Sequence, residues 1–594
     1  MREYATPPNV EMPTTGSLVD DVVINAAEAP DAVVFCRHDG DEWREVTAHE
    51  FLEQVTAVAK GLLAAGARPG DRVALMCRTR YEWTLIDYAI WFVGAVTVPV
   101  YPTSSHDQVA WILRDSGAEL AVVETAGHAE LVRAATGERP LRRRWVLDEG
   151  GIEQLTTQGA GVDEQVLERR RAETRPDSLA TIIYTSGTTG RPRGCMLTHG
   201  NFQHEIGAAV EELDALFAGE GAATLLFLPL AHVFARVIQV GAVRTRVRLG
   251  FSPDARNLVQ DLAAFRPTFL LAVPRVFEKL FNSASQRAAA DGRGRIFDRA
   301  AETAIAYSRA LGAGRPGRVL RIRHAVFDRL VYTRLRELLG GRCAYAVSGG
   351  APLGERLGHF YRGIGVVVLE GYGLTETSAA VTVNTPDGLK IGTVGRPLGG
   401  TTVRVAEDGE LCVRGGQVLR GYWRDEAATR AAIGDGWFHT GDLGEIDDEG
   451  FVRVTGRKKE ILVTAGGKNV APAGLEDQVR AHPLVSQCLV VGDGRPFVAA
   501  LVTIDPDALA PWADTRGKSS VVADLVDDPA LRAEVQGAVD AANRTVSQAE
   551  SIRGFTILPK DWTEEGGELT PSLKLKRAVV TAGLRREIDA LFDQ

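Results

Sequence analysis

Cysteine is scarce in this chain of 594 residues, and its spacing excludes two common structural uses. The six cysteines form no CxxC pair of the kind that holds structural zinc. They are also too few for a disulfide scaffold, so we expect a reducing compartment. They lie at Cys36, Cys77, Cys195, Cys343, Cys412 and Cys488.

An excess of positive charge and a membrane-spanning run are missing too. The formal net charge of -9 gives no general reason to bind nucleic acid, which needs clustered Lys and Arg. Residues 1–20 lack the basic region and apolar core of a secretory signal. The most apolar stretch, 83–100, is broken by Asp87, Gly94 and Pro99, which suits a buried helix and strand. We expect a cytoplasmic protein without a nucleic-acid partner.

Length and composition favour a soluble chain with more than one domain. With 45% hydrophobic and 24% charged residues, the composition is that of ordinary globular proteins. A single core rarely grows beyond about 250–300 residues. Between residues 71 and 125, strand-like and helix-like runs alternate, which predicts βαβ units and a largely parallel sheet. The strand-like runs cover 72–76, 96–100 and 120–123, and the helix-like runs cover 80–93 and 106–116.

Later segments predict further layers and a second, smaller domain. Strand-like runs resume at residue 179 and indicate a second α/β layer, and the turn-rich stretch 392–448 predicts a small β subdomain. Beyond Lys459 the pattern restarts as a separate α+β unit. We therefore predict an α/β fold with an N-terminal domain over 1–458 and a C-terminal domain over 459–594.

An Arg-rich helical segment stands out against the acidic whole. Residues 281–342 contain 13 Arg, no Lys and five acidic residues. Within 326–339 the apolar residues recur near the helical period and leave charged residues on the other face. A surface helix packed on a core is the favoured interpretation, and contact with a membrane surface or an acidic ligand is the alternative.

The composition of residues 184–194 predicts phosphate binding. A strand-like run ending at Tyr184 leads into small hydroxyl residues and glycines, which let backbone N–H groups approach an anion, while Arg191 and Arg193 add positive charge. The Walker pattern GxxxxGK[ST] is not matched, so a P-loop NTPase is disfavoured. The loop residues concerned are Thr185, Ser186, Gly187, Thr188, Thr189 and Gly190.

This loop resembles the signature loop of the adenylate-forming superfamily, which includes acyl-CoA synthetases. Arg193 stands where the family usually has Lys. The positive charge is kept, but a planar guanidinium carries it in place of a flexible ammonium. Further family-like strings follow in the family's order, and the resemblance covers nearly the whole chain. It implies ATP and Mg²⁺ as ligands, with CoA as co-substrate.

The resemblance assigns nucleotide and metal roles to the middle of the chain. The strings Ser348-Gly349-Gly350-Ala351-Pro352-Leu353 and Glu370-Gly371-Tyr372-Gly373-Leu374-Thr375-Glu376-Thr377 are similar to adenine-pocket motifs. Tyr372 would stack on adenine, and Thr375 would touch the α-phosphate. Glu376 and Thr185 would hold Mg²⁺, since a hard cation prefers oxygen ligands. Gly349, Ala351 and Gly371 would line the nucleotide pocket.

Later motifs imply a ribose site, a hinge and a catalytic lysine. Asp442 would accept hydrogen bonds from both ribose hydroxyls, with Arg457 beside it. Lys459 would be the pivot of a mobile C-terminal domain. Lys574, three residues before Arg577, would bridge the substrate carboxylate and the α-phosphate. In a second orientation the turn containing Gly466, Gly467 and Lys468 would flank the pantetheine of CoA.

The implied substrate is a long-chain fatty acid. His232 lies in a string similar to the motif that borders the acyl pocket, and residues 81–101 and 436–460 resemble long-chain fatty acid–CoA ligases in particular. A fatty-acyl-AMP ligase that delivers to a carrier protein is the nearest alternative, and a non-catalytic nucleotide-binding regulator is a third. Peripheral contact with the inner face of a membrane and a homodimer are left open.

Overall fold

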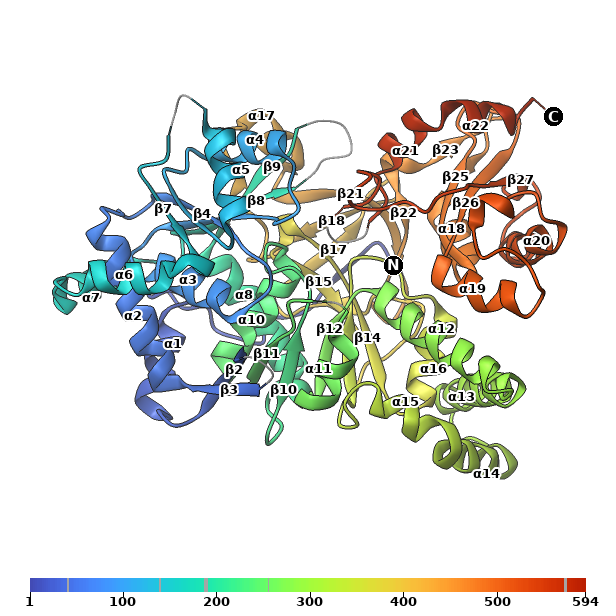
Figure 1. The fold of residues 1–594 in the computed structure, drawn as a ribbon, viewed down its shortest axis with the longest axis horizontal. Helices are drawn as coiled ribbons and strands as arrows, with labels where there is room; N and C mark the ends of the chain where they lie inside the picture. The colour runs from blue at the N-terminus through green and yellow to red at the C-terminus, as the bar shows by residue number, and fades with distance from the viewer. Residues whose placement is uncertain (40–41, 138–139, 186–190, 255, 571–573, 594) are drawn as a thin grey trace.

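The computed structural model describes residues 1–39, 42–137, 140–185, 191–254, 256–570 and 574–593. It contains a large N-terminal part built from three sheets and a smaller C-terminal part to its right in Figure 1. The predicted α/β class is therefore confirmed. Within the described residues, no helix is both long and apolar enough to span a membrane.

The first sheet contains seven strands in the order β19-β9-β8-β5-β4-β6-β7. The five strands from β8 to β7 run parallel, as the βαβ alternation predicted, and β9 returns antiparallel to β8. The strands are β4 (Arg72–Met76), β5 (Val96–Val100), β6 (Leu120–Val123), β7 (Arg143–Val146), β8 (Leu179–Thr185), β9 (Arg193–Thr198) and β19 (Gly421–Tyr422). The helices between them are α3 (Tyr81–Phe92), α4 (His106–Ser116), α5 (Ala126–Thr136), η1 (Leu147–Glu149), α6 (Gly151–Gly159) and α7 (Glu164–Glu173).

The second sheet contains nine strands in the order β16-β15-β14-β13-β12-β10-β11-β2-β3, with a parallel centre and antiparallel ends. Its strands are β2 (Val33–Asp39), β3 (Glu42–Thr47), β10 (Ala223–Leu226), β11 (Arg248–Phe251), β12 (Phe269–Ala272), β13 (Tyr345–Ser348), β14 (Val367–Leu374), β15 (Ala379–Val383) and β16 (Arg396–Pro397). Its helices are α1 (Asp20–Glu28), α2 (Ala48–Ala64), α8 (His199–Glu212), α9 (Asp214–Phe217), α10 (Val233–Thr245), α11 (Leu258–Phe265), α12 (Pro274–Ala290), α13 (Gly294–Gly312), α14 (Arg318–Phe327), the π-helix η2 (Asp328–Tyr332), α15 (Thr333–Glu337), α16 (Glu355–Gly363) and η3 (Thr375–Thr377).

The predicted small β subdomain is a six-stranded antiparallel sheet. The short strand β1 adds the N-terminus of the chain to this sheet by pairing with β17. The elements are β1 (Glu3–Ala5), β17 (Thr402–Val405), β18 (Glu410–Arg414), α17 (Glu426–Ala432), β20 (Ile433–Gly434), β21 (Trp437–Ile446), β22 (Val452–Arg457) and η4 (Lys458–Glu460).

The C-terminal part has its own core around the three-stranded sheet β25-β26-β27. Its contacts with the rest include Arg275, which donates to the backbone oxygen and the hydroxyl of Ser486 at 3.2 and 3.1 Å. The elements are β23 (Leu462–Val463), β24 (Asn469–Val470), α18 (Pro472–Arg480), β25 (Val485–Val491), β26 (Val498–Ile504), α19 (Pro506–Asp514), η5 (Val522–Asp524), α20 (Pro529–Asn543), β27 (Ile552–Ile557), α21 (Arg577–Gly583) and α22 (Arg585–Ala590).

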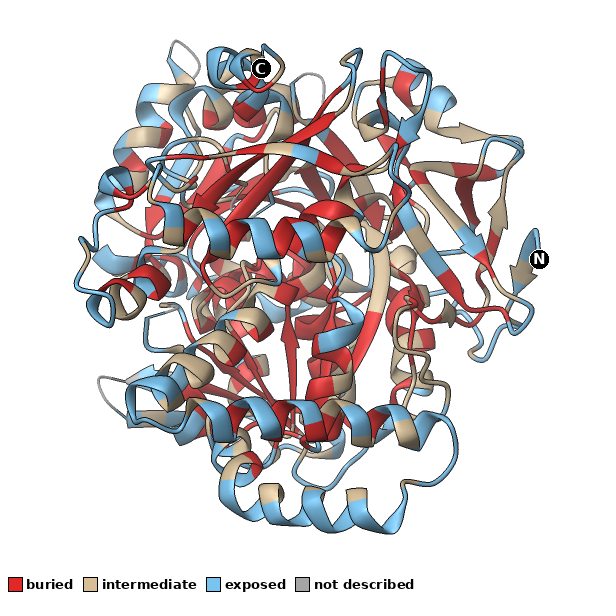
Figure 2. Cartoon of the chain, turned by 90° about the vertical axis from the view of Figure 1, so that its right-hand side faces the viewer, coloured by how far each residue is buried: buried red, intermediate tan, exposed pale blue. Residues whose placement is uncertain are grey.

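Capping residues explain where several of these helices begin. Thr198 accepts a hydrogen bond from the backbone N–H of Asn201, whose side chain accepts one from Thr198 in return. Ser105 makes the same reciprocal cap at the start of α4 with Gln108. Such pairs satisfy backbone donors that the first turn of a helix leaves free. Figure 2 shows that burial is concentrated in the strands and on the inner faces of these helices.

A charged pair is completely buried between the two large sheets. Arg236 on α10 forms an ion pair with Asp87 on α3, and both side chains are fully buried. The Arg236 guanidinium also donates to the hydroxyl of Thr181 at 2.6 Å and lies 5.0 Å from the ring of Trp91. Paired charges with additional hydrogen bonds can be accommodated in a core, whereas a single charge cannot. No role was predicted for Arg236 from the sequence, and the structure places its side chain in the core.

Glu205 on α8 is a buried carboxyl without a cationic partner among the described residues. One oxygen accepts from the backbone N–H of Ala380 at 3.2 Å, and the other has no hydrogen-bond partner among those residues. Burial raises the pKa of Glu205 to about 8. The folded protein therefore holds a proton that the unfolded chain releases near its ordinary, lower pKa.

We expect Glu205→Gln to stabilise the protein at alkaline pH. The stability that the protonated Glu205 provides is complete below its unfolded pKa and is lost as pH rises toward 8. The variant should exceed the wild type by roughly a few kcal/mol at pH 8.5, and the gap should shrink toward pH 5. Urea unfolding at both pH values measures this, with the exposed Glu211→Gln as control. A gap that does not depend on pH would contradict the assignment.

Candidate active site

Several predicted site residues lie at the carboxyl ends of parallel strands from two sheets. Thr185 is the last residue of β8, Ser348 is the last of β13, and Tyr372 lies near the end of β14. Ligands of open α/β sheets bind outside the carboxyl ends of such strands. The predicted loop residues Ser186, Gly187, Thr188, Thr189 and Gly190 lie outside the described residues.

Thr185 and Glu376 meet at one buried thiol. The Thr185 hydroxyl lies 3.7 Å from the sulfur of Cys195, and the Glu376 carboxylate is close enough to affect the pKa of this thiol. Burial and the nearby Glu376 carboxylate raise the pKa of the Cys195 thiol well above its usual range, so the thiol stays neutral. Among the described residues no cationic side chain forms an ion pair with Glu376. A carboxylate near a hydroxyl offers the oxygen donors that Mg²⁺ prefers.

Tyr422 and Asp425 connect Arg193 to this carboxylate, and the sequence prediction missed both. The Tyr422 hydroxyl donates to Glu376 Oε1 at 3.0 Å. The Arg193 guanidinium lies 5.7 Å from the centre of the Tyr422 ring, and its Nε lies 3.6 Å from Asp425. Arg193 therefore reaches the site edge through an aromatic and an ionic contact. The pairing of β19 with β9, more than 200 residues apart, brings Tyr422 there, and no local sequence signal marks it.

Asp442, Tyr372 and Arg457 form a second cluster. Tyr372 donates its hydroxyl to Asp442 Oδ2 at 2.7 Å, and Arg457 donates Nε–H to Oδ1 at 3.0 Å. Burial raises the pKa of Tyr372 well above its ordinary value, so this hydroxyl remains a donor. A carboxylate offers about four acceptor positions, and Asp442 can therefore accept further bonds. The structure brings these three predicted residues together.

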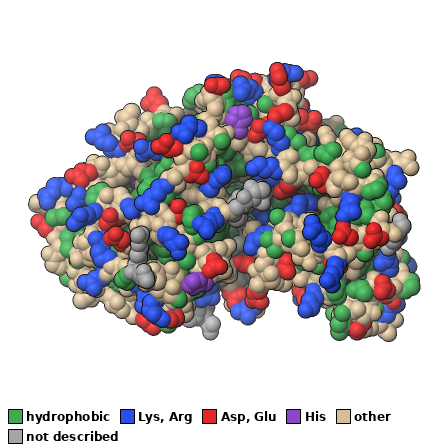
Figure 3. All heavy atoms as spheres, turned by 90° about the horizontal axis from the view of Figure 1, so that it is seen from above, with side chains coloured by type: hydrophobic (Ala, Val, Ile, Leu, Met, Phe, Trp, Pro, Cys, Tyr) green, Lys and Arg blue, Asp and Glu red, His purple; other side chains and the backbone are tan. Residues whose placement is uncertain are grey.

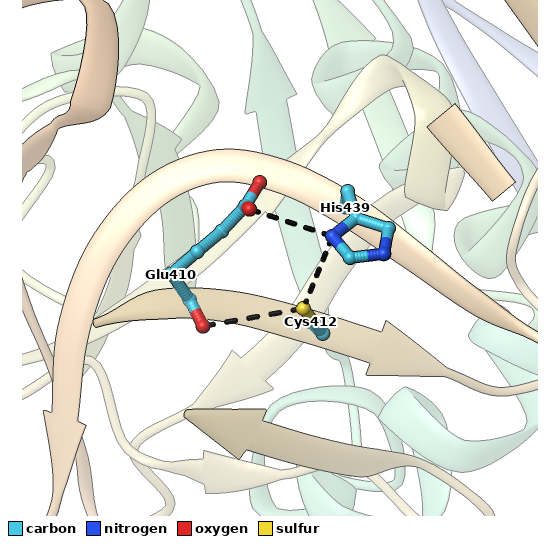
Figure 4. A group of neighbouring side chains, drawn as sticks. All are labelled: Glu410, Cys412 and His439. Atoms are coloured by element: carbon cyan, nitrogen blue, oxygen red, sulfur yellow. Dashed lines mark hydrogen bonds and ion pairs between the residues drawn. The ribbon is translucent and has the colours of Figure 1, made fainter. Parts of the chain in front are cut away.

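Glu410 supports the strand that carries Asp442. Its carboxylate accepts from the backbone N–H of Gly441 at 2.8 Å and lies 3.4 Å from the His439 ring and 3.3 Å from the Lys458 ammonium. Figure 4 shows Glu410 and His439 facing each other across β18 and β21. Hydrogen bonding on both sides fixes the position of the segment that ends at Asp442.

Cys412 completes a Glu–Cys–His group whose ligand atoms lie within 4.8 Å of one another (Figure 4). Its sulfur lies 3.5 Å from His439 Nδ1. Burial raises the pKa of this thiol, which therefore stays protonated, and the Lys458 ammonium already supplies positive charge to Glu410. A metal ligand must be the thiolate, so we interpret the group as a hydrogen-bonded support.

Lys574 reaches from the C-terminal part into the N-terminal site. A Cβ atom placed on Gly350 would lie 3.7 Å from Cε and 3.9 Å from Nζ of Lys574. The side chain is still reached by solvent, but surrounding protein atoms and the Arg457 charge lower its pKa, while Asp442 and Glu376 oppose this. The Lys574 ammonium is thus placed beside both carboxylate clusters.

His232 lies close to the same ammonium and caps helix α10. Its Nδ1 accepts a hydrogen bond from the backbone N–H of Phe234 at 3.2 Å. Burial and the Lys574 charge lower the pKa of His232 to about 3, so the imidazole is neutral at physiological pH. Nδ1 is an acceptor, so Nε2 carries the proton. A neutral N–H donor therefore borders the site.

Two predicted glycines have close neighbours that explain the residue type. A Cβ atom on Gly349 would meet the Phe234 ring at 3.0 Å, and one on Gly371 would lie 3.1 Å from the backbone oxygen of Thr382. Ala351 is exposed at the end of the same turn, and Thr375 is buried at the start of η3. Glycine at these two positions therefore allows close packing against Phe234 and the Thr382 backbone.

The predicted CoA and hinge residues lie apart from these clusters. Gly466, Gly467 and Lys468 form the exposed turn between β23 and β24, and Lys468 pairs with Glu550 at 3.4 Å. Across the described ranges, no hydrogen bond or ion pair links this turn to Lys574. Lys459 is exposed in η4, directly after the sheet that carries Arg457.

The two parts of the chain border a hollow. Seen from above in Figure 3, the surface is recessed between them, and Lys, Arg, Asp, Glu and hydrophobic side chains all lie along the recess. Arg457 in the N-terminal part is close enough to Lys574 in the C-terminal part for its charge to lower the pKa of Lys574. This arrangement suits an anionic substrate that is enclosed by both parts.

Comparison with known proteins gives the same family for nearly the whole chain. Residues 23–423 match the AMP-binding enzyme family, and residues 459–594 match the AMP-binding enzyme C-terminal domain. The chain is 51% identical over 601 residues to the long-chain-fatty-acid–CoA ligase FadD15 of Mycobacterium bovis, with 100% of both chains covered. It is 32% identical to the peroxisomal long chain acyl-CoA synthetase 7 of Arabidopsis thaliana, and the aligned region covers 94% of this chain and 83% of that protein.

Solved structures share the fold at low identity. The adenylation domain of a carboxylate reductase from Mycobacterium chelonae has a TM-score of 0.75 at 22% identity, covering 97% of this chain and 91% of that one. The o-succinylbenzoate CoA synthetase of Bacillus subtilis, solved with ATP and a magnesium ion, has a TM-score of 0.67 at 20% identity, covering 94% and 98%. The resemblance to the adenylate-forming superfamily is confirmed by the family matches and the full-length relative, and this chain belongs to the AMP-binding enzyme family.

Proposed function

We propose that this protein activates a long-chain fatty acid with ATP and transfers the acyl group to CoA, with release of AMP and pyrophosphate. The position of Lys574 against the Gly350 turn, within electrostatic reach of Glu376 and Asp442, is the observation that supports the activation step. The full-length similarity to a long-chain-fatty-acid–CoA ligase supports the choice of acid and acceptor.

The nucleotide would lie across the two clusters. Thr185, Arg193 and the loop between them would receive the phosphates, and Thr375 would approach the α-phosphate. The adenine would lie against Tyr372, and Asp442 with Arg457 would bind the ribose. Gly349, Ala351 and Gly371 would form the backbone wall of this pocket, and Gly349 and Gly371 pack closely against Phe234 and Thr382 behind it.

Thr185 and Glu376 would hold Mg²⁺, because a hydroxyl and a carboxylate are oxygen ligands that a hard cation prefers, and the neutral Cys195 thiol nearby adds no charge. When bound, the ion neutralises negative charge on the phosphates of ATP.

Activation would join the carboxylate of the fatty acid to AMP. A carboxylate oxygen attacks the α-phosphorus, the bond to pyrophosphate breaks, and acyl-AMP remains. The Lys574 ammonium offsets the repulsion between the two oxyanions and stabilises charge that develops on the phosphorus. The neutral His232 donates from Nε2 near the carboxylate without adding a competing positive charge.

Transfer would require the C-terminal part to turn. Rotation at Lys459 would remove Lys574 and bring Gly466, Gly467 and Lys468 toward the site, where the CoA thiol attacks the acyl carbonyl and AMP leaves. The exposure of this turn in the present orientation is compatible with such a movement. The domain limits 1–458 and 459–594, the cytoplasmic location and the homodimer stay predictions.

Two alternatives differ in their products. A fatty-acyl-AMP ligase would release pyrophosphate but form no acyl-CoA, and a regulator would release none. The experiment supplies ATP, Mg²⁺ and acids of graded chain length, and measures pyrophosphate and acyl-CoA with and without CoA. Long-chain acids should give both products in the presence of CoA. Pyrophosphate without any acyl-CoA would favour the first alternative, and no pyrophosphate with any acid would refute ligase activity.

A further inference from the structure

Helix α14 and the following turn η2 expose a continuous apolar row. The side chains of Val319, Ile322, Val326 and Leu330 have exposed fractions of 73%, 67%, 51% and 57%. They follow each other at spacings of three, four and four residues and therefore lie on one face of the helix. No residue of α14 is buried. Four large apolar side chains on one exposed face form a patch of the kind that marks an interaction surface.

Arginines border this row on both sides. Within α14, Arg318 falls on one flank and Arg323 on the other at helical periodicity, and Arg329 follows in η2 next to Leu330. Residues 315–337 contain seven Arg and two acidic residues, whereas the whole chain has a net charge of -9. Within the described ranges, the side chains of Arg318 and Arg329 make no hydrogen bond or ion pair. These guanidinium groups are therefore free to bind an external anion.

The opposite face already holds the helix on the protein. The His324 ring stacks on Tyr307 of α13 at 3.8 Å, and its Nε2 lies 2.6 Å from the backbone oxygen of Gly363. The hydroxyl of Tyr332 donates to the backbone oxygen of Ala300 at 2.7 Å. The exposed row is thus not needed to attach α14. Figure 1 places α14 at the lower right margin, and Figure 2 shows a largely exposed helix along the same lower edge.

We propose that the Val319–Ile322–Val326–Leu330 row, with the flanking arginines, docks the protein on an anionic lipid surface. A helix with apolar side chains on one stripe and cations beside it lies in the plane of a membrane interface, with the apolar stripe in the acyl boundary and the cations at the headgroups. Anionic headgroups attract each nearby arginine, and this attraction weakens with salt. The local positive charge on an acidic protein orients this face toward such a surface.

The inference is independent of the proposed function, because lipid binding can be measured without ATP, CoA or fatty acid. Sedimentation with vesicles of phosphatidylcholine, alone or with 30% phosphatidylglycerol, measures the bound fraction of the full chain. The wild type should bind the mixed vesicles at low salt and bind pure phosphatidylcholine at least about tenfold more weakly.

Two variants separate the apolar and the charged contributions. Val319→Ser/Ile322→Ser/Val326→Ser and Arg318→Ala/Arg329→Ala should each reduce binding to mixed vesicles about tenfold or more. Ile24→Ser/Val521→Ser/Val579→Ser, at exposed apolar positions elsewhere, is the matched control and should bind like the wild type. An unchanged thermal unfolding midpoint shows that each variant is folded.

The outcomes decide between a lipid and a protein partner. Loss of binding in both test variants but not in the control supports the docking surface. Failure of the wild type to bind mixed vesicles, or equal binding by both test variants and the wild type, overturns it. A dimer in light scattering that the Val319→Ser/Ile322→Ser/Val326→Ser variant abolishes, without vesicle binding by the wild type, would assign the row to a second copy of the chain instead.

Discussion

Replacing Lys574 with alanine should slow pyrophosphate release with a long-chain acid by roughly a hundred- to a thousandfold. The reason is electrostatic: the ammonium lies against the Gly350 turn, near the carboxylates of Glu376 and Asp442, where two further oxyanions must approach each other. Binding of ATP should change much less, since Asp442, Arg457 and the phosphate loop remain. Fixed-time assays of pyrophosphate release at saturating ATP measure the effect.

The neighbouring Lys576→Ala is the matched control, because it removes the same charge two residues away. Preformed acyl-AMP with CoA provides a second readout, in which Lys574→Ala should form thioester at close to the wild-type rate. An unchanged rate of pyrophosphate release in Lys574→Ala, or a larger loss in Lys576→Ala, would refute the assignment.

Removing Arg236 should destabilise the protein by about 3–5 kcal/mol, because it leaves the Asp87 carboxylate buried without its cation. Arg236→Met keeps much of the side-chain volume and removes the charge. Urea unfolding followed by fluorescence measures the free energy of unfolding. The exposed Arg133→Met, which breaks an ion pair with Glu130 on the surface, should leave that free energy nearly unchanged.

The double variant Asp87→Leu/Arg236→Met distinguishes a lost pair from a lost contact. If the isolated carboxylate causes the destabilisation, the double variant should recover a large part of the stability. A double variant as unstable as the sum of the two single variants would show that the pair itself contributes little beyond packing.

Local sequence patterns were sufficient to predict several individual strands of the fold. The predicted strands at 72–76, 96–100 and 120–123 match β4, β5 and β6 at every boundary. Alternation of buried runs and capping residues fixes such elements locally. The nine-stranded order could not be predicted in this way, because β2 joins β11 across about 200 residues of sequence.

In the candidate site, too, local motifs could be recognised in the sequence, whereas residues placed by long-range strand pairing could not. Contiguous motifs pointed to Thr185, Glu376, Asp442 and Lys574, and their roles as site residues stay predictions. Tyr422, which reaches Glu376 through strand pairing, gave no signal of its own. The Arg-rich segment was interpreted mainly as a helix packed on a core, and the exposed row beginning at Val319 became visible only with the orientation of α14.

The central claim is that this chain makes an acyl adenylate by attack of a carboxylate on the α-phosphorus of ATP. A long-chain fatty acid labelled with ¹⁸O in both carboxylate oxygens tests it directly, with ATP, Mg²⁺ and CoA present. One carboxylate oxygen stays on the phosphorus when the thiol displaces AMP, so mass spectrometry should find one ¹⁸O atom in each AMP formed. Unlabelled AMP accompanying acyl-CoA formation would contradict the account.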